Sequence, residues 1–319
     1  MNNKNITILS VNISEKKGTI KKPVAQIQLT LDGVEGDAHA GKWHRQVSLL
    51  GIESIEKFST EAQRKVDFGE FAENITTSGA ELYKFQPLDR LICGEVILEV
   101  TQIGKECHGS NCAIFKEVGD CVMPKEGIFC RVINGGILEP GMEFIYKPKI
   151  FNIQIITLSD RASQGEYEDK SGPRIKELIQ EYFVNHYSLF TIQYSPFTIH
   201  YSLIPDDPSL LKSLLLKSKA ERTDLIFTTG GTGIGPRDFT PDVVKPLLDK
   251  EISGIMDMIR LKYGAEKPNA LISRSIAGVM DQSLIFTLPG SVKAVNEYME
   301  VIAKLLLHMI YMFHGLDKH

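Results

Sequence analysis

The chain has 319 residues, of which 36 are Lys or Arg and 40 are Asp or Glu, giving a formal net charge of −4. This balance argues against a nucleic-acid-binding protein, because such proteins carry a strong basic excess. Hydrophobic residues make up 43% and charged residues 24% of the chain, which excludes an intrinsically disordered protein and is ordinary for a globular one. At about 150 residues per domain, the length predicts two domains.

The apolar segments predict neither export nor membrane insertion, so we expect a soluble, cytoplasmic protein. Met1–Lys4 leads into a polar segment without the apolar core of a secretory signal peptide. The most apolar stretch, Val301–Phe313, is interrupted by Lys304 and His308. This stretch is shorter than the roughly 18 residues of a membrane-spanning helix, and we expect a buried terminal helix instead.

Residues 1–146 are expected to form a β-rich domain, because short β-prone runs alternate there with glycine turns. These runs are Ile6–Val11, Gln26–Leu31, Val47–Leu50, Val96–Ile103, Phe129–Ile133 and Glu143–Tyr146. One helix is predicted over Ile52–Lys65. Strands at this spacing are typical of a compact β barrel or sandwich.

From residue 151 the pattern changes to strand–loop–helix units, so we place a second domain at residues 151–319, after a proline-containing linker at residues 147–150. The predicted strands are Ile153–Leu158, Ile199–Ile204, Asp224–Thr228 and Leu284–Leu288. The predicted helices are Pro173–Phe183, Ser209–Lys219, Pro241–Asp249 and Val292–His314. Apolar strands that alternate with helices indicate an α/β fold, with a mostly parallel sheet flanked by helices.

All five cysteines fall in the N-terminal half, at positions 93, 107, 112, 121 and 130. An odd count without a signal peptide argues against a disulfide framework. Three interpretations stay open: buried core residues, a structural zinc site, or one reactive thiolate among bystanders. The absence of a Cys-x-x-Cys pair weakens the zinc interpretation. Cys107 stands out because Lys105 and His108 are its close sequence neighbours, and nearby cations favour the thiolate.

Each predicted strand of the C-terminal half ends in a polar loop. In a parallel sheet these loops meet at the carboxyl edge, which is the usual ligand crevice. The loop after the third strand has glycines that can turn tightly and present N–H groups to an anion, at positions 230, 231, 233 and 235. Thr232 adds a hydroxyl donor, and Arg237 can bind phosphate oxygens with both arms of its guanidinium.

Two further loops complete the predicted chemistry. Gly290 and Ser291 open a helix whose first N–H groups can take another phosphate or carboxylate. Asp206 and Asp238 follow adjacent strands, and two acids near phosphates are suited to hold a magnesium ion. The combination predicts phosphoryl or nucleotidyl transfer.

Each of these features also has a purely structural interpretation. The segment GGTGIG matches neither the Walker pattern nor the dinucleotide fingerprint, and a glycine-rich turn is often only a turn. Asp242 follows Thr240-Pro241 and is expected to charge the first turn of a helix, with Thr240 as its N-cap. We favour this structural role for Asp242. For Asp206 and Asp238 we favour function, because two acids and two anion-binding loops converge on one edge.

The loop segments carry a family resemblance that covers the second half of the chain in order. Ser159–Pro173, Leu203–Asp207, Thr228–Asp242 and Leu288–Ser291 resemble the Mog-type molybdopterin adenylyltransferases and the G domain of gephyrin. The resemblance implies an α/β fold, usually trimeric, that binds molybdopterin and Mg-ATP. It also implies transfer of AMP to the terminal phosphate of the pterin, with release of pyrophosphate.

By the same resemblance, Asp206 and Asp238 are the catalytic acids and the predicted magnesium ligands. The substrate-binding candidates are the other polar and glycine residues of the four loops: Ser159, Asp160, Ser171, Gly172, Gly230, Gly231, Thr232, Gly233, Arg237, Pro289, Gly290 and Ser291.

The N-terminal half resembles a MOSC domain over roughly residues 5–146. The similar segments are Val34–Gly41, Trp43–Leu50, Gly69–Thr77, Leu91–Val100 and Gly135–Gly141. The resemblance implies a β-rich barrel that binds molybdenum cofactor or carries sulfur on one cysteine. By order along the chain that cysteine is Cys107, which would also bind the molybdenum. Cys112 is the rival, and Cys130 is interpreted as structural.

A few polar residues are candidates for the pocket of this domain: Asp37, His39, Arg45, Asn74 and Arg131. The alternative is that Asp37 and Asn74 are turn residues, His39 lies on the surface and Arg131 is a solvated strand residue.

Together the two resemblances predict a bifunctional enzyme of molybdenum or tungsten cofactor biosynthesis. They imply a homotrimer through the C-terminal domain, with molybdenum-insertion proteins and apo-molybdoenzymes as partners. Two alternatives stay open. The protein could be a non-catalytic pterin carrier or trimeric scaffold, or an unrelated magnesium-dependent nucleotidyltransferase.

Overall fold

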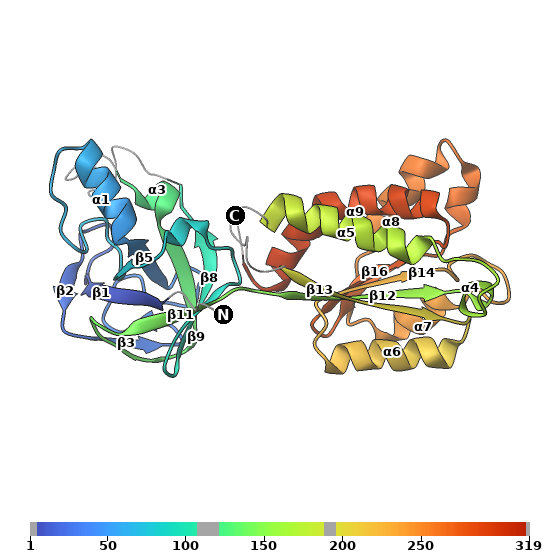
Figure 1. The fold of residues 1–319 in the computed structure, drawn as a ribbon, viewed down its shortest axis with the longest axis horizontal. Coiled ribbons are helices and arrows are strands. Elements are labelled where there is room, and N and C mark those ends of the chain that lie inside the picture. The colour runs from blue at the N-terminus through green and yellow to red at the C-terminus, as the bar shows by residue number, and fades with distance from the viewer. Residues whose placement is uncertain (1–4, 107–120, 188–195, 317–319) are drawn as a thin grey trace. The chain divides into compact units, whose positions relative to one another are not determined.

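The structure is a computed structural model that describes residues 5–106, 121–187 and 196–316. It divides into two compact units (Figure 1). One unit comprises Met1–Lys149 with Tyr311–His319, and the other comprises Ile150–Ile310. Each unit has a hydrophobic core of its own.

The N-terminal unit is a closed β barrel, because β11 (Glu143–Lys147) pairs both with β7 (Arg90–Cys93) and with β1 (Asn5–Ile13) and so completes a ring of strands. The order around the barrel is β1, β11, β7, β8 (Val96–Ile103), β9 (Ile128–Asn134), β5 (Val47–Gly51) and β6 (Ile75–Ser78). Only the β5–β6 pair of this ring is parallel. The strand β2 (Lys22–Val24) joins β1, and a small sheet holds β10 (Gly136–Leu138), β3 (Ile27–Thr30) and β4 (Gly33–Val34).

Alternation of apolar and polar residues explains the barrel. In β1, Ile6 and Ile8 are fully buried and their neighbours are more exposed, as expected for a strand with one face in the core. The helix α1 (Ile52–Glu61) adds Phe58, whose ring meets that of Phe71 edge to face at 5.1 Å. The 3₁₀ turn η1 (Leu82–Lys84) and the short helix α3 (Met123–Glu126) also belong to this unit.

The helix predicted over Ile52–Lys65 ends four residues early, at Glu61. Ala62 is the C-cap, and Gln63 then adopts a left-handed backbone conformation with a φ of 49°. An α-helix cannot continue through that conformation. This helix is therefore shorter than predicted. The predicted β barrel is confirmed by the closed ring of strands.

The C-terminal unit is a three-layered α/β structure around a six-stranded sheet (Figure 1). The strand order is β13 (Phe197–Ile204), β12 (Phe151–Leu158), β14 (Leu225–Thr229), β17 (Ser283–Leu288), β16 (Ala277–Met280) and β15 (Lys250–Glu251). The first four strands are parallel, and the last two pair antiparallel. The predicted parallel sheet is thus confirmed for the four predicted strands, and β15 and β16 make the sheet mixed.

Helices cover both faces of this sheet. One face carries α5 (Ser171–Tyr187), α8 (Ser253–Gly264) and α9 (Val292–Phe313), and the other carries α6 (Pro208–Ala220) and α7 (Thr240–Val244). Shorter helices are α4 (Asp160–Ser163), η3 (Lys245–Leu247) and η4 (Pro268–Ile272). Within the described ranges, no helix combines the length and apolarity needed to span a bilayer.

The predicted helix Pro241–Asp249 is wrong in its second half. The α-helix gives way to the 3₁₀ turn η3, which contains Pro246, and β15 begins at Lys250. Proline lacks the N–H that would continue the α-helical hydrogen bonds. Thr240 is also not the N-cap. Phe239 takes that position, and the Thr240 hydroxyl instead donates to the carbonyl of Gly230 at 2.9 Å.

Stacked aromatic rings lie at the centre of the C-terminal sheet. Phe227 of β14 and Phe286 of β17 are register partners, both fully buried, with ring centroids 5.2 Å apart. Because the two strands also carry the site loops at their ends, the packing of these rings fixes the base of the site.

We predict that Phe227→Ala lowers the free energy of unfolding of the C-terminal unit by about 3–5 kcal/mol, the usual cost of emptying a buried aromatic site. Urea denaturation measures this loss. The control is Val184→Ala on α5, whose side chain is 54% exposed, for which we expect a change within about 0.5 kcal/mol. Equal losses in both variants would contradict the packing described.

Candidate functional site

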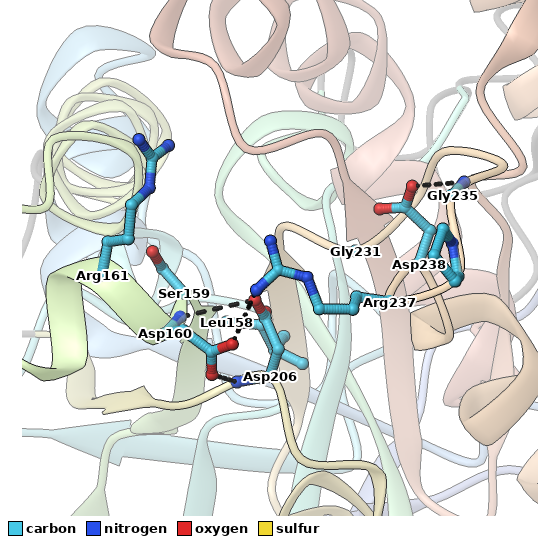
Figure 2. A pocket seen from close by; sticks show the side chains of 10 residues that line it. Leu158, Ser159, Asp160, Arg161, Asp206, Gly231, Gly235, Arg237 and Asp238 are labelled. Carbon is cyan, nitrogen blue, oxygen red and sulfur yellow. Dashed lines mark hydrogen bonds and ion pairs between the residues drawn. The ribbon is translucent and has the colours of Figure 1, made fainter.

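A cavity of about 290 Å³ lies at the carboxyl edge of the C-terminal sheet. Three loops form it, which follow β12, β13 and β14 (Figure 2). The lining residues are Leu158, Ser159, Asp160, Arg161, Asp206, Gly231, Gly235, Pro236, Arg237 and Asp238. Residues that the sequence placed at three separate strand ends therefore meet in one hollow.

Asp160 and Asp206 hold each other's backbone at one side of this cavity. The Asp160 carboxylate accepts a hydrogen bond from the Asp206 N–H at 2.8 Å, and Asp206 accepts one from the Asp160 N–H at 3.4 Å. Arg237 donates to Oδ2 of Asp160 at 2.9 Å. Figure 2 shows the Arg237 side chain reaching from the loop of Asp238 toward the other two acids. The cavity thus contains three carboxylates and a guanidinium that links two of its loops.

The surroundings of Asp206 oppose its ionisation. Burial raises the pKa of this carboxyl above its usual range, and the negative charges of Asp160 and Asp238 raise it further. The hydrogen bond from the Asp160 N–H and the positive charge of Arg237 act in the opposite direction. The pKa of Asp206 is therefore set in part by the charges of Asp160, Arg237 and Asp238.

Glycines make room for the third acid. Oδ2 of Asp238 accepts a hydrogen bond from the Gly235 N–H at 2.8 Å. A Cβ atom on Gly233 would lie 2.7 Å from the same oxygen, which is closer than real Cβ contacts allow. Gly231 has a φ of 63°, and a Cβ there would lie 2.6 Å from the Thr240 hydroxyl. Glycine is thus required at position 233 for the loop to fold around the Asp238 carboxylate, and at position 231 for it to pack against Thr240.

A second cavity of about 450 Å³ adjoins the first and shares Leu158 and Ser159 with it. Its lining residues are Thr157, Leu158, Ser159, Tyr167, Glu168, Asp169, Lys170, Ser171, Gly290 and Val292. The Ser159 hydroxyl lies 2.8 Å from that of Tyr167, and Arg161 stacks over the Tyr167 ring at 5.2 Å. Two molecules bound in the two cavities would therefore be neighbours.

Asp169 organises the second cavity, although the sequence analysis gave it no role. Its carboxylate accepts hydrogen bonds from the hydroxyls of Thr157, Tyr201 and Ser171 at 2.7–2.8 Å, and from the Gly172 N–H at 3.1 Å. Burial raises the pKa of Asp169, but these donors outweigh burial and hold the pKa below its usual range. Asp169 is therefore a fixed anion that shapes the loop before α5.

Six of the predicted binding residues line neither cavity: Gly172, Gly230, Thr232, Gly233, Pro289 and Ser291. They shape the loops instead. The hydroxyl of Ser291, for example, accepts a hydrogen bond from the Ala294 N–H and so caps α9. Thr232 is buried. The other predicted residues of the C-terminal half do line a cavity.

In the N-terminal unit, Asp37 and His39 lie together with Lys21, which the sequence analysis missed. Lys21 and Asp37 form a buried ion pair, and Nδ1 of His39 is 3.4 Å from both partners. Burial raises the pKa of Asp37, but hydrogen bonds from His39 and Lys21 outweigh it and leave the pKa well below its usual range. Nothing in the sequence separates Lys21 from its exposed neighbour Lys22.

The remaining N-terminal candidates differ in their surroundings. The Asn74 side chain is buried and bonded to Asn12 and Ser48, which agrees with the structural interpretation. Arg131 forms an ion pair with Glu99 at 2.6 Å. Cys107 and Cys112 lie outside the described residues. Cys130 is fully buried in β9, where burial raises the pKa of its thiol.

Arg45 is the N-terminal candidate whose hydrogen bonding is incomplete. Its guanidinium lies 4.9 Å from the centre of the Trp43 ring and 5.9 Å from that of Phe129. The Lys105 amine is also 5.9 Å from the Phe129 ring. The Nε atom of Arg45 is buried without a hydrogen-bond partner in the structure. Two cations therefore flank one aromatic ring, and one of them has an unused donor.

Two family models match the chain. One, described as a probable molybdopterin binding domain, covers residues 154–308, and the other, a MOSC domain, covers residues 36–144. Gephyrin of Dictyostelium discoideum is 37% identical over 171 residues, which are 52% of this chain and 23% of that protein. The chain therefore spans about a quarter of gephyrin's length.

A molybdopterin adenylyltransferase of Helicobacter pylori is 35% identical over 156 residues, 47% of this chain and 81% of that enzyme. Among solved structures, the molybdopterin biosynthesis enzyme MoaB of Thermus thermophilus is 36% identical. That match covers 52% of this chain and 97% of MoaB, with a TM-score of 0.44.

We predict that the pKa of Asp206 rises in Arg237→Ala and falls in Asp238→Asn, because the first change removes a positive charge and the second a negative one. Titration followed by carboxyl ¹³C NMR measures both shifts. The control is Arg161→Ala, because the Arg161 side chain lines the same cavity but stacks on the Tyr167 ring. Shifts of the same sign in the two test variants would show that the described charge arrangement is wrong.

Proposed function

Because the chain belongs, through residues 154–308, to the family of molybdopterin adenylyltransferases, we propose that its C-terminal unit transfers AMP from ATP to the terminal phosphate of molybdopterin. The observation that carries the proposal is the pair of adjoining cavities, joined at Leu158 and Ser159, with three acids and Arg237 in one of them. A phosphate oxygen of the pterin attacks the α-phosphorus of ATP. The bond from that phosphorus to the β-phosphate oxygen breaks, and pyrophosphate leaves.

The acidic cavity fits the triphosphate and its metal. Within the described ranges no group of three or more His, Cys, Asp or Glu side chains forms a complete metal site. Mg²⁺ is commonly held by one or two carboxylates together with substrate phosphates, and Asp206 and Asp238 would supply the carboxylates. Burial and the negative charges of Asp160 and Asp238 raise the pKa of Asp206, and this supports the assignment because a bound cation would favour the ionised carboxylate. When bound, Mg²⁺ would neutralise charge on the phosphates and on the leaving pyrophosphate.

The chain's own residues would orient the two substrates. Arg237 is placed to exchange its contact with Asp160 for a phosphate oxygen, since its guanidinium is exposed in the cavity. Gly290, just before α9, and Val292, its first residue, line the second cavity, so the N-terminal end of this helix would take the pterin phosphate. The main contributions are thus positioning and charge neutralisation.

We propose that the N-terminal unit binds the cofactor or carries its sulfur on Cys107. The buried Nε atom of Arg45 without a hydrogen-bond partner, and the Lys105 amine over the same Phe129 ring, support a negatively charged ligand near Phe129. In this role Arg45 and Lys105 would hold phosphate, and the molybdenum of a bound cofactor would take the thiolate as a soft ligand. The two units would then act on the same cofactor in sequence.

We further propose a homotrimer through the C-terminal unit, with molybdenum-insertion proteins and apo-molybdoenzymes as partners. Exposed apolar residues on α8 and η4 supply a surface for assembly, namely Met258, Leu261, Leu271 and Ile272. The alternative of a pterin carrier without turnover is the less favoured one, because a carrier has no need for the acid cluster beside Arg237.

We predict that Asp206→Asn and Asp238→Asn each reduce adenylyl transfer by at least about 100-fold, because each carboxylate would hold the Mg²⁺ that stabilises charge on the leaving pyrophosphate, and losing one electrostatic stabiliser of a transition state usually costs this much. Pterin binding stays intact. The assay measures adenylylated pterin and pyrophosphate from molybdopterin and Mg-ATP. The matched control is Asp207→Asn, because Asp207 caps α6 and asparagine caps a helix as well.

Full activity in both test variants would overturn the catalytic assignment. Tight pterin binding without product in the wild type would favour the carrier. Turnover with other phosphate acceptors but not with the pterin would favour an unrelated nucleotidyltransferase.

We predict that Cys107→Ser abolishes sulfur transfer or metal retention by the N-terminal unit, whereas Cys130→Ala leaves both unchanged. The reason is that a buried thiol with a raised pKa does not form the reactive thiolate. Metal analysis of the purified protein and a persulfide assay measure the two properties. Loss in Cys112→Ser but not in Cys107→Ser would identify the rival cysteine.

A further inference from the structure

Arg274 lies outside both cavities, yet it contacts the loop that carries Asp238. It sits between η4 and β16, in a short segment that neighbouring helices hold in place. Arg260 of α8 donates to the carbonyls of Ser273 and Ser275 at 3.3 and 3.2 Å. Tyr298 of α9 donates to the Ser273 hydroxyl at 2.9 Å. Arg274 therefore projects from a fixed base.

Three carbonyls of the glycine-rich loop accept hydrogen bonds from this one residue. The Arg274 backbone N–H donates to Thr232 at 2.8 Å, and its Nε donates to Gly233 at 2.7 Å. Nη2 donates to the carbonyl of Asp238. The remaining arm, Nη1, forms an ion pair with Asp242 at 2.8 Å. Arg274 thus bonds to both ends of the loop segment 232–238 and to the helix that follows.

The loop needs such an external partner. Residues 230–238 lie between β14 and the N-cap of α7 and form no regular helix or strand, so their carbonyls lack the partners that a helix or a sheet would supply. Four of these residues are glycines, whose backbone loses the most entropy on ordering. The planar guanidinium offers donors in a fixed fork, which suits several carbonyls at once.

We propose that Arg274 is a positioning residue that holds the Asp238 carboxylate and the glycine-rich loop in the geometry needed for metal–nucleotide binding. The proposal rests on the proposed function of the C-terminal unit. Among the described residues, the Asp238 carboxylate accepts its hydrogen bond from within its own loop, from the Gly235 N–H, whereas Arg274 holds the Asp238 backbone. Its place in the cavity is therefore set by whatever fixes the loop as a whole.

The start of the loop, at Gly230 and Gly231, is anchored separately. We therefore expect the loss of Arg274 to have a local effect. Thr240 donates from its hydroxyl to Gly230 and from its N–H to Gly231, at 2.9 and 3.0 Å. These contacts hold the start of the loop against α7 without Arg274. Loss of Arg274 should release residues 232–238 and leave the sheet and α7 folded.

The test compares Arg274→Ala and Arg274→Lys with wild type in three measurements: amide hydrogen exchange, Mg-ATP binding by calorimetry, and adenylyl transfer. We expect exchange in residues 231–239 to rise at least about tenfold in Arg274→Ala, with β14 and β17 unchanged. The apparent Mg²⁺ affinity and kcat should each fall about 10- to 100-fold, as for the loss of other groups that orient metal ligands. The KM for the pterin should stay constant.

Two controls separate positioning from general stability. Asp242→Asn removes only the ion pair and leaves the three carbonyl contacts, so its loss of kcat should be smaller than that of Arg274→Ala. Arg174→Ala removes an arginine of α5 that pairs with Glu177 and does not contact the loop, and it should change neither exchange nor Mg²⁺ affinity. Arg274→Lys should restore part of the Mg²⁺ affinity, because a lysine can satisfy one or two of the carbonyls.

Unchanged loop exchange in Arg274→Ala would overturn the proposal. So would increased exchange with unchanged Mg²⁺ affinity and kcat, since the loop would then be ordered without functional effect. If the wild type transfers no AMP at all, the proposed function fails. Exchange and Mg-ATP binding then still decide whether Arg274 orders this site.

Discussion

The parallel alignment of β13, β12, β14 and β17 is the constraint on which the C-terminal unit depends. Because these strands run in one direction and in register, their carboxyl ends lie at one edge of the sheet. Loops separated by about 30 to 80 positions in the sequence therefore meet, and Ser159, Asp206 and Asp238 come to share one cavity. The buried aromatic pair between β14 and β17 keeps those strand ends in place.

The chemistry of the cavity follows from placing like charges together. Burial raises the pKa of Asp206, the negative charges of Asp160 and Asp238 raise it further, and the positive charge of Arg237 offsets this only in part. Such a site favours ligands that bring positive charge to the acids and negative charge to the arginine. A magnesium–triphosphate complex has both, which connects the observed electrostatics to the proposed reaction.

Much of the site could be predicted because the residue types and their positions after strands are local properties. Asp206, Asp238, Arg237 and the glycines follow apolar runs that can be recognised without a structure. Arg274 and Lys21 could not be predicted, because a charged residue in a loop or beside a second lysine has no local mark of its contacts. Their roles depend on segments 36–42 and 16 positions away, respectively.

Periodicity and turn residues act over short distances. The amino-acid sequence was therefore enough to predict the two-part organisation, the four parallel strands, most of the helices and the acids at the strand ends. The tertiary structure decided the closure of the barrel through β1 and β11, the antiparallel strands β15 and β16, and the end of α1 at Glu61. It also decided which loop residues face a cavity and which only shape it. These features depend on packing between segments that are distant in the sequence. Short-range sequence patterns do not encode such packing.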